Sequence, residues 1–411
     1  MGADRARRRR RRPLAETADV VVIGGGVHGA SLVYALASRG VRRVVLVEKG
    51  ALASGASGRS SALVRMHYTN EWDARLAFAS FPVFRDWSEI MGGPGVFTHT
   101  GFVCTVAPPY AEALRRNVAM LRAIGINTVA LSPAELGALQ PFANVDDLGA
   151  AAYEPESGYA NPAAVVEGFG RRARELGARV LQWTTVTSIV RRESRVVGVE
   201  STAGRIDAGA VVVAAGAWAP HLCREMGLAL PARPKALDTV LVTRPPELAR
   251  PHLTFIDNAG GTYFRPESGV LTLVGVASQA WDLDPDGPMA LPAEAPATGA
   301  QLLTHRIPAM ERATLARGYR AVDGYSRDRH AILGRVEGVD GLYLATAFSG
   351  AGFKIAPAVG ACMAELILDG RAKTVDIEVF SLARFAAGRS PEGPHPYAPR
   401  PDHAEPVPGR W

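Results

Sequence analysis

The sequence predicts an α/β fold in which a nucleotide-binding domain with a parallel sheet carries a second, discontinuous α+β domain. Three observations lead to this prediction: a βαβ pattern over residues 18–50, a buried strand within 208–219, and a strand, glycine turn and helix over 341–370. The stretches between them, about 91–149 and 233–317, instead mix short strand patterns with proline breaks. A chain of 411 residues is long enough for two such domains.

The composition indicates a globular chain that does not insert into a membrane. Hydrophobic residues make up 47% of the sequence and charged residues 21%. The longest apolar run, within 208–219, is about 12 residues long, which is too short to span a bilayer. The three cysteines, Cys104, Cys223 and Cys362, lie far apart and form no CxxC pair. We therefore expect no metal site, no disulfide framework and a cytoplasmic location.

Both ends of the chain are expected to be disordered. Residues 1–16 form a basic leader whose arginine run, 4–12, supplies most of the net charge of +6. Since no aromatic residue interrupts this run, we interpret it as a solvated segment and expect no nucleic-acid partner. The alternative is a nucleic-acid-binding arm, which salt-sensitive binding through residues 4–12 would reveal. Residues 389–411 form a proline-rich tail.

The βαβ pattern begins with an apolar strand over residues 20–23. After a glycine cluster, apolar residues recur at helical spacing as far as Gly40, which stands where a helix C-cap is expected. Residues 44–47 form a second strand that ends at Glu48. The crossover between two parallel strands is expected to be right-handed.

The later elements divide the chain into two domains. Residues 179–218 predict a strand, a hairpin and a further buried strand, and Ser132 with Glu135 has the spacing of a helix capping box. We expect the nucleotide-binding domain over 17–90, 150–232 and 318–388, and a substrate domain over 91–149 and 233–317.

Gly24, Gly26 and Gly29 form a G-x-G-x-x-G pattern between the first strand and the helix. The first glycine allows a tight turn, the second lets a phosphate approach the backbone, and the third lets the helix pack against the strand. Glu48 follows the second strand, where a carboxylate can accept both ribose hydroxyls. These features predict a Rossmann-type dinucleotide site.

Two later segments favour FAD over NAD. The buried strand within 208–219 returns to the sheet after a hairpin layer that is unusual for a simple dehydrogenase. The turn at 349–354 places a second helix N-terminus near the site. The partial positive charge of this terminus would stabilise the negative charge of a reduced flavin.

Five motifs mark the chain: "VVVIGGGVHGASLVYALASRG", "GASGRSSALVR", "VVVAAGAWAP", "GGTYFRPESG" and "FSGAGFKIAPAVG". Together they resemble the D-amino-acid-oxidase family of FAD-dependent oxidoreductases, and in particular sarcosine oxidases, dimethylglycine dehydrogenases and glycine oxidase. The resemblance covers about residues 17–385. It implies a Rossmann-type FAD-binding domain with a glutathione-reductase-like sheet and a discontinuous α+β substrate domain.

The resemblance also implies which residues hold the cofactor. The ADP half would be held by Gly24, Gly26, Gly29 and Glu48, and Val186 would give backbone contacts to adenine. The other implied cofactor residues are Ser57, Arg59, Ser60 and Ser61 near the pyrophosphate and flavin, Gly216 and Trp218 beside the cofactor, and Gly350, Gly352, Phe353 and Lys354 at the pyrimidine edge.

In sarcosine oxidases, an arginine after the second motif's glycine–serine loop and the lysine of the GFK sequence bind the substrate carboxylate. The matching residues here are Arg65 and Lys354. A planar guanidinium and a compact ammonium can each bind one carboxylate oxygen. Arg320, which is similar to a substrate arginine of glycine oxidase, and Tyr263 are further candidates that rank below this pair. For these four residues, the alternative to substrate binding is a structural or solvent-facing position.

Three positions depart from the family pattern. Ala321 stands where monomeric sarcosine oxidase has its flavin-linking cysteine, so we expect non-covalent FAD, with His67 or His330 as the remaining route to a covalent bond. Residues 272–273, Thr-Leu, stand where the oxidases carry an oxygen-activating lysine, which favours a dehydrogenase. Ala351 replaces a histidine that is common in the family.

We infer an FAD-dependent oxidation of the C–N bond of a small amino acid, with a secondary or N-methyl amine as the favoured substrate. Hydride transfer to flavin N5 would leave an imine that water hydrolyses, and O2 or another electron acceptor would complete the cycle. Arg65 and Lys354 would orient the carboxylate for this transfer. Two alternatives remain open: a 2-hydroxy-acid dehydrogenase that uses His67 or His330 as its base, and a non-catalytic flavoprotein of the same fold.

Overall fold

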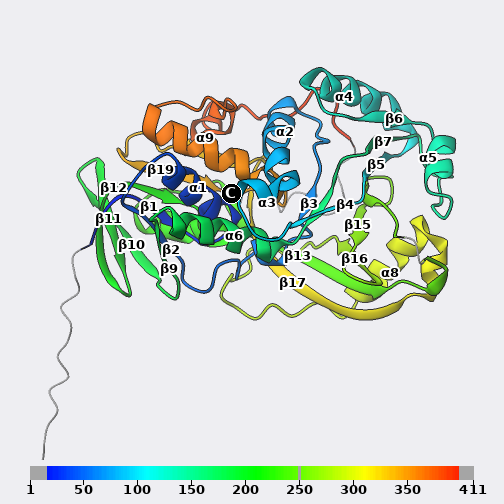
Figure 1. Cartoon of the computed structure of the whole chain (residues 1–411), viewed down its shortest axis with the longest axis horizontal. Helices are drawn as coiled ribbons and strands as arrows, with labels where there is room; N and C mark the ends of the chain where they lie inside the picture. The colour runs from blue at the N-terminus through cyan, green and yellow to red at the C-terminus, as the bar shows by residue number, and fades with distance from the viewer. Residues whose placement is uncertain (1–15, 249–250, 398–411) are drawn as a thin grey trace, which may run out of the picture.

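The computed structural model describes residues 16–248 and 251–397. Two eight-stranded sheets form the two halves of the molecule, and a small three-stranded sheet completes the strand content of this part of the chain (Figure 1). Within the described ranges, no helix combines the length and the apolar character that a bilayer crossing requires. The expected leader, except for its last residue, lies outside the described residues.

The first sheet contains the predicted βαβ unit. Strands β1 (Glu16–Ile23) and β2 (Val44–Val47) pair in parallel, and helix α1 (Val27–Ser38) connects them. The other strands of this sheet are β9 (Arg179–Leu181), β10 (Val186–Arg192), β11 (Arg195–Ser201), β12 (Gly204–Val213), β18 (Ile332–Arg335) and β19 (Leu342–Thr346). Strand β12 joins β1 and β19 in parallel, and its first residues pair with the β10–β11 hairpin. The predicted strand and hairpin order over 179–218 is therefore confirmed.

Residues 20–23 of β1 are apolar without alternation because both faces of the sheet are covered there. Val20 and Val22 pack into a core with helices α1, α6 (Pro162–Glu175) and α9 (Ala356–Asp369), which lie together in Figure 1. Val21 and Ile23 face a second core that includes α7 (Ala219–Glu225). The continuous apolar run follows from burial on two sides.

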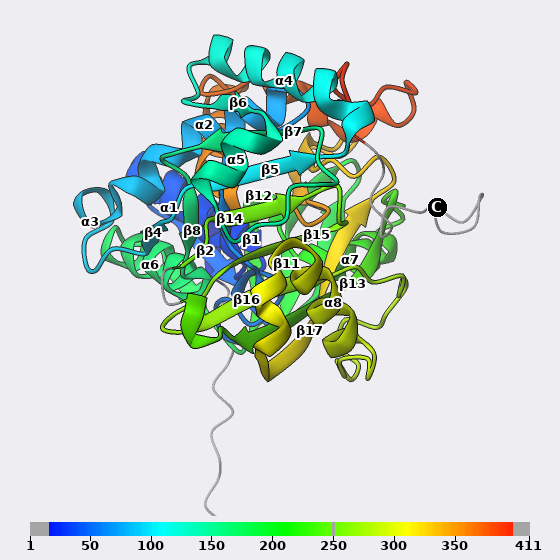
Figure 2. The same cartoon turned by 90° about the vertical axis from the view of Figure 1, so that its right-hand side faces the viewer.

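The second sheet is antiparallel except for one parallel pair, β14 with β5. In spatial order it contains β17 (Thr314–Ser326), β13 (Ala232–Thr243), β16 (Leu271–Val276), β15 (Thr262–Pro266), β14 (Thr254–Asp257), β5 (Phe102–Val106), β7 (Ala150–Glu154) and β6 (Val129–Leu131). Figure 2 shows this half with α8 (Ala295–Arg306) over its lower strands and α4 (Ala111–Ile124) at its upper edge.

Three helices and a small sheet complete the regular structure. Helix α5 (Pro133–Leu139) begins with the predicted capping box, since Ser132 and Glu135 each accept a hydrogen bond from the other's backbone. The remaining elements are α2 (Glu71–Arg85), α3 (Trp87–Ile90), β3 (Leu63–Val64), β4 (Phe97–His99) and β8 (Gly158–Ala160). Strand β8 pairs with both β3 and β4.

Strand pairing leads us to propose a change in two of the expected domain boundaries. Strand β7 pairs with β5 and β6, and β17 pairs along its whole length with β13. Boundaries at 150 and 318 would therefore cut through the second sheet. A local hydrophobic pattern identifies a strand but not its partner, which comes from a distant part of the chain. We propose that residues 150–154 and 314–326 belong to the substrate domain.

The C-terminal segment also differs from expectation, because residues 389–397 pack against the rest of the protein. Asn117 Nδ2 on α4 donates a hydrogen bond of 2.8 Å to the carbonyl oxygen of His395. A Cβ atom on Gly393 would collide with the carbonyl oxygen of Thr69, so the two backbones are in direct contact. The proline content predicted a disordered tail, and nothing in the sequence indicated these contacts. Residues 398–411 of the expected tail lie outside the described residues.

A buried ion pair links α8 to the second sheet and generates a stability prediction. Arg306 Nε lies 2.8 Å from Asp257 Oδ2, and both side chains are 0% exposed. Arg306→Met would leave the Asp257 carboxylate buried without this cation, so we expect urea denaturation to show a loss of about 3–5 kcal/mol in the free energy of unfolding.

The control is Arg312→Met, which removes an exposed ion pair with Glu247. Exposed pairs contribute about 0–1 kcal/mol, so this variant is expected to unfold close to the wild type. Similar losses in both variants would contradict a special role for the buried pair.

Candidate functional site

A cavity of about 890 Å³ opens where the parallel strands of the first sheet end and continues to the second sheet. Residues that follow β1, β2, β12 and β19 form one end of its wall, and residues of β13, β14 and β15 form part of the other. Ligands of open α/β sheets bind at the carboxyl ends of the strands. The volume lies within the usual range for ligand pockets, about 300–1,000 Å³.

The glycine turn at the start of α1 is closely packed. Gly24 has φ +113°, and a Cβ there would collide with the carbonyl oxygen of Ala214 at the end of β12. A Cβ on Gly29 would collide with the carbonyl oxygen of Gly24, so α1 rests directly on the turn. Gly24 and Gly26 line the cavity, whereas Gly29 lies behind it as the residue that permits this packing.

Glu48 and Ser57 complete the nucleotide end of the cavity. The Glu48 carboxylate accepts hydrogen bonds from Gly25 N at 2.6 Å and Gly50 N at 2.7 Å. These bonds orient the carboxylate, which has about four acceptor sites and can still receive ribose hydroxyls. Ser57 Oγ accepts from Val27 N at 2.9 Å and so satisfies one of the amides at the N-terminus of α1.

The other expected cofactor residues also lie in the cavity wall. They are Arg59, Ser60, Ser61, Val186, Gly216, Trp218, Gly350, Gly352, Phe353 and Lys354. Arg59 Nη1 donates to the carbonyl oxygen of Gly55 at 3.3 Å, and Trp218 Nε1 donates to Asp286 Oδ2 at 3.0 Å. The structure therefore brings together residues from three distant parts of the sequence.

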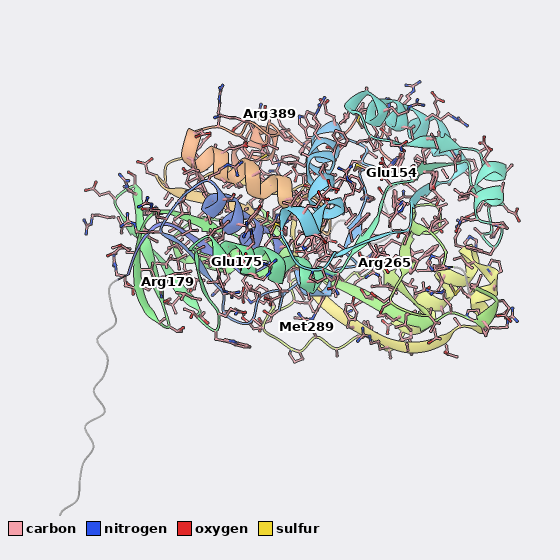
Figure 3. All side chains as sticks on the ribbon, viewed as in Figure 1. Glu154, Glu175, Arg179, Arg265, Met289 and Arg389 are labelled. Atoms are coloured by element: carbon pink, nitrogen blue, oxygen red, sulfur yellow. The ribbon has the colours of Figure 1, made fainter. Side chains whose placement is uncertain are left out.

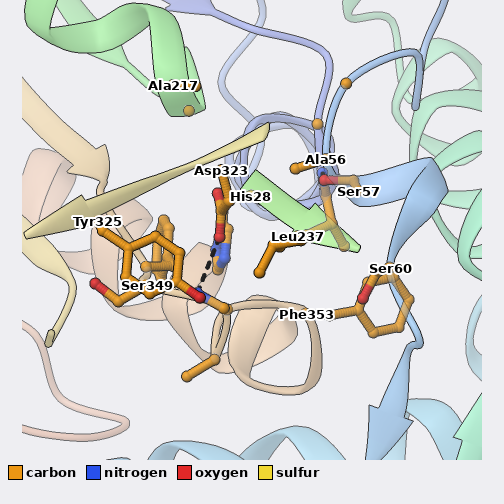
Figure 4. A pocket seen from close by; sticks show the side chains of 18 of the residues that line it. His28, Ala56, Ser57, Ser60, Ala217, Leu237, Asp323, Tyr325, Ser349 and Phe353 are labelled. Atoms are coloured by element: carbon orange, nitrogen blue, oxygen red, sulfur yellow. Dashed lines mark hydrogen bonds between the residues drawn. The ribbon is translucent and has the colours of Figure 1, made fainter. Parts of the chain in front are cut away.

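Asp323 fixes the C-terminal glycine turn. Its carboxylate accepts hydrogen bonds from Gly350 N at 2.9 Å, drawn as a dashed line in Figure 4, and from Gly324 N at 2.8 Å. Burial raises the pKa of Asp323 above its ordinary value, although the two amides act against this shift. Sequence reasoning missed this residue, because it lies on β17, far from the glycine motif in the sequence.

His28 joins this turn to the first helix. Its ring stacks on Phe348 with centroids 3.4 Å apart, and a Cβ on Gly352 would lie 2.6 Å from His28 Nε2. Burial lowers the pKa of His28 to about 3, so the ring is neutral at physiological pH. His28 was also missed, although its position directly after the glycine turn could have indicated a place in the cavity wall.

Arg65 and Lys354 both lie close to Tyr68. The Arg65 guanidinium carbon lies 4.4 Å from the centroid of the Tyr68 ring, and Lys354 Nζ donates to the Tyr68 hydroxyl at 3.3 Å. Arg65 also donates to the carbonyl oxygen of His67, while its buried Nε has no hydrogen-bond partner among the described residues. All four side chains contribute to the cavity wall.

Two buried charged side chains of the second half hold the loop that carries Arg65 (Figure 3). Glu154 accepts a hydrogen bond from Met66 N at 2.9 Å, and Arg265 Nε donates to the carbonyl oxygen of Ser61 at 2.5 Å. Burial raises the pKa of Glu154, and its bonds to Met66 and Ser157 act in the opposite direction. These contacts fix the loop from both ends.

A second buried group contains Asp73 and His330. Asp73 Oδ2 lies 3.0 Å from His330 Nδ1 and accepts from Asn70 Nδ2 at 2.9 Å. Burial raises the pKa of Asp73, but these hydrogen bonds and the charges of His330 and Lys354 bring it below its ordinary value. Asp73 and His330 both line the cavity. The Asp73 carboxylate therefore fixes the position of His330 within the cavity wall.

The remaining candidates lie in different places. Tyr263 and His67 line the cavity. Arg320 does not; it pairs across strands with Asp238, with Nε–Oδ1 at 2.7 Å and Nη2–Oδ2 at 2.8 Å. The register of β17 against β13 therefore pairs the Arg320 guanidinium with a carboxylate of the neighbouring strand, outside the residues that line the cavity. In the described chain, no cluster of histidine, cysteine or acidic side chains could hold a metal ion.

Comparisons with known proteins agree with this geometry. A family model described as "FAD dependent oxidoreductase" (DAO) matches residues 19–366. Mitochondrial sarcosine dehydrogenase of Homo sapiens is 28% identical over 390 residues, which cover 91% of this chain and 42% of that protein. Sarcosine oxidase subunit beta of Rhodobacter capsulatus is 26% identical, with 90% of this chain and 89% of that protein covered.

The solved structures include L-proline dehydrogenase from P. horikoshii, with a TM-score of 0.84 and 26% identity. The alignment covers 92% of this chain and 100% of that one. By contrast, this chain spans less than half the length of the sarcosine dehydrogenase that it matches.

Gly29→Ala tests the packing of α1 on the glycine turn. The added methyl group would push the helix from the carbonyl oxygen of Gly24, at a cost of about 1–3 kcal/mol in unfolding free energy. We expect a lower Tm and less FAD retained through purification, measured from the flavin absorbance. The matched control is Gly137→Ala in α5, where the nearest atom to a new Cβ is 3.8 Å away. This variant is expected to be neutral or more stable by about 0.5–1 kcal/mol; equal behaviour of the two variants would refute the packing argument.

His28→Leu tests the burial of a neutral imidazole. The pKa of His28 is lowered to about 3 in the folded protein, whereas the unfolded chain takes up this proton near its ordinary pKa of about 6.5. The wild type therefore loses stability as the pH falls from about 6.5 towards 3. In the variant, the slope of unfolding free energy against pH between 4 and 6 should decrease by about 1.4 kcal/mol per pH unit. Urea denaturation at several pH values measures this slope, and an unchanged slope would argue against a neutral buried His28.

Proposed function

Because the chain belongs to the family of FAD-dependent oxidoreductases, we propose that it oxidises the C–N bond of a small amino acid that carries a secondary or N-methyl amine. The observation that carries this proposal is that Arg65 and Lys354 both lie beside Tyr68 in the cavity wall. This arrangement can hold one carboxylate between a guanidinium and an ammonium group.

The cavity wall fits FAD. The glycine turn leaves no room for side chains, Glu48 is oriented by two backbone amides, and the turn at 350–352 is held by Asp323. Bound FAD would supply the acceptor for the hydride that leaves the substrate carbon. The wall residues Gly24, Gly26, Glu48, Ser57 and Val186 would hold its ADP half. Ala321, at the position of the family's linking cysteine, is consistent with non-covalent binding.

Arg65 and Lys354 would bind and orient the substrate carboxylate. Charge-assisted hydrogen bonds contribute about 1.5–3 kcal/mol each. Arg65 Nε is buried and lacks a partner among the described residues, so a carboxylate would satisfy a donor that is otherwise unpaired. The loop contacts of Glu154 and Arg265 keep the guanidinium in place before substrate arrives.

The wall near Arg65 favours a neutral amine. Ile256 and Tyr263 contribute apolar surface there, and burial together with the charge of Arg65 lowers the pKa of His67 to about 3. Desolvation disfavours a protonated amine, and only the neutral amine has the lone pair that assists loss of hydride from the adjacent carbon. The resulting imine would be hydrolysed by water.

The relatives support this substrate class. Their names include sarcosine and L-proline, which are both secondary amino acids. The electron acceptor, O2 or another oxidant, belongs to the same proposal. Thr272 and Leu273, at the position of the oxygen-activating lysine, do not line the cavity.

The pair of His330 and Asp73 favours a second candidate, oxidation of a 2-hydroxy acid. Removal of hydride from an alcohol requires a base for the hydroxyl proton. His330 lines the cavity, and its Nδ1 lies 3.0 Å from the Asp73 carboxylate, which orients the ring. Reduction of the flavin by 2-hydroxyglutarate but by no amine would favour this candidate.

Replacement of either cation tests the proposal. An anaerobic titration with sarcosine, dimethylglycine, proline, glycine and 2-hydroxyglutarate would follow bleaching of the flavin absorbance. We expect an amine to bleach the wild type, and Arg65→Met or Lys354→Met to raise its half-saturating concentration about 10- to 150-fold.

The matched controls are Arg75→Met and Lys373→Met, which remove exposed ion pairs with Glu71 and Asp369. Both should bind substrate as the wild type does. Unchanged half-saturation in the Arg65 and Lys354 variants would remove the carboxylate site, and a flavin that no amine bleaches would overturn the proposed reaction.

A further inference from the structure

The C-terminal segment forms part of the cavity wall. Four of its residues line the cavity beside the loop that carries Arg65: Glu392, Gly393, Pro396 and Tyr397. No motif in the sequence placed this segment near the site, and the proposed reaction does not use it. Its position shows that the chain closes the cavity with its own C-terminal residues.

Three contacts hold this segment against both halves of the molecule. Gly393 packs directly on the backbone of Thr69, at a distance that excludes any side chain at position 393. Asn117 on α4 donates to the carbonyl oxygen of His395 at 2.8 Å. The Tyr397 hydroxyl lies 2.8 Å from His67 Nε2.

Tyr397 occupies the part of the cavity that adjoins Arg65. Its ring lies nearly parallel to that of His67, with centroids 6.0 Å apart and an angle of 16° between the planes. It also packs against an apolar cluster of the second half that includes Cys104 and Ile256, two residues of the same wall. Arg65 is close enough to lower the pKa of Tyr397, although burial raises that pKa overall.

We propose that Tyr397 is a specificity-determining residue that limits the size of the substrate group beyond the carboxylate. This inference rests on the proposed function, because it takes Arg65 and Lys354 as the carboxylate site. A carboxylate held by Arg65 directs the rest of a substrate into the space bounded by Tyr397, His67 and Tyr263. The Tyr397 ring fills that space on one side, and the contacts of Gly393 and His395 keep it there. Small amino acids fit, and bulky substituents collide with the ring.

Two variants of Tyr397 separate the ring from its hydroxyl group. Tyr397→Ala removes the wall, whereas Tyr397→Phe keeps the ring and loses only the hydrogen bond to His67. Gly393→Val is an independent variant, because its side chain collides with Thr69 and must displace the segment. FAD content and Tm of each full-length holoprotein would establish that it is folded.

The first readout is binding of inert carboxylates, measured as the Kd for acetate and for benzoate from the shift of the flavin spectrum. The second is anaerobic flavin reduction by sarcosine, N-methylalanine and N-methylphenylalanine. We expect Tyr397→Ala and Gly393→Val to increase the preference for the larger over the smaller ligand by about 10-fold or more. Tyr397→Phe should keep the preference of the wild type.

An unchanged preference in both Tyr397→Ala and Gly393→Val would overturn the inference, while the effects of Arg65→Met would still report on the carboxylate site. If Tyr397→Phe shifted the preference as much as Tyr397→Ala, the hydroxyl group alone would be responsible. That result would also refute the proposal that the Tyr397 ring limits the size of the substrate. A gain in benzoate binding in Tyr397→Ala, without reduction by any amine, would support the wall and overturn the proposed reaction instead.

Discussion

The site depends on the direct contact between α1 and the glycine turn that follows β1. Because Gly29 has no side chain, the helix approaches the carbonyl oxygen of Gly24 and its N-terminus lies at the edge where the parallel strands end. His28 lies two residues after Gly26 and packs against Gly352 and Phe348. A shift of α1 would therefore displace the C-terminal turn, and with it Lys354.

The far end of the cavity is held by buried polar groups that act in pairs. Glu154 binds the backbone of Met66, and Asp73, in the helix α2 that follows, binds His330. The chain just before and after Met66 carries Arg65 and Tyr68. A binding site of this kind is organised before the ligand arrives, so little side-chain freedom is lost when a carboxylate binds. The C-terminal segment fixes a further part of the cavity wall, since Tyr397 forms a hydrogen bond with His67.

The residues expected at the two ends of this cavity rest on different kinds of sequence information. The glycine turn, Glu48 and the strand order over 179–218 follow from local patterns, because each depends on residues that are close in the sequence. The positions of Arg65 and Lys354 came from the resemblance to a family, and the structure places both beside Tyr68. Arg320 pairs instead with Asp238 of the neighbouring strand, a contact that the sequence did not predict. Asp323 carries no local signal that could identify it, and the only signal for His28 was its place beside the glycine turn.

The sequence by itself determined the fold class and a dinucleotide cofactor, because a glycine turn between a buried strand and a helix has few other physical uses. The later segments and the family resemblance then favoured FAD over NAD. The sequence also determined the family to which the chain belongs. Only the tertiary structure decided which sheet β7 and β17 join, and that residues 392–397 close the cavity. The physical reason is common to both: strand pairing and docking of an extended segment depend on surfaces formed by distant residues. A proline-rich sequence predicts disorder, whereas the contacts of this segment with Thr69 and Asn117 exist only once distant parts of the chain have folded together.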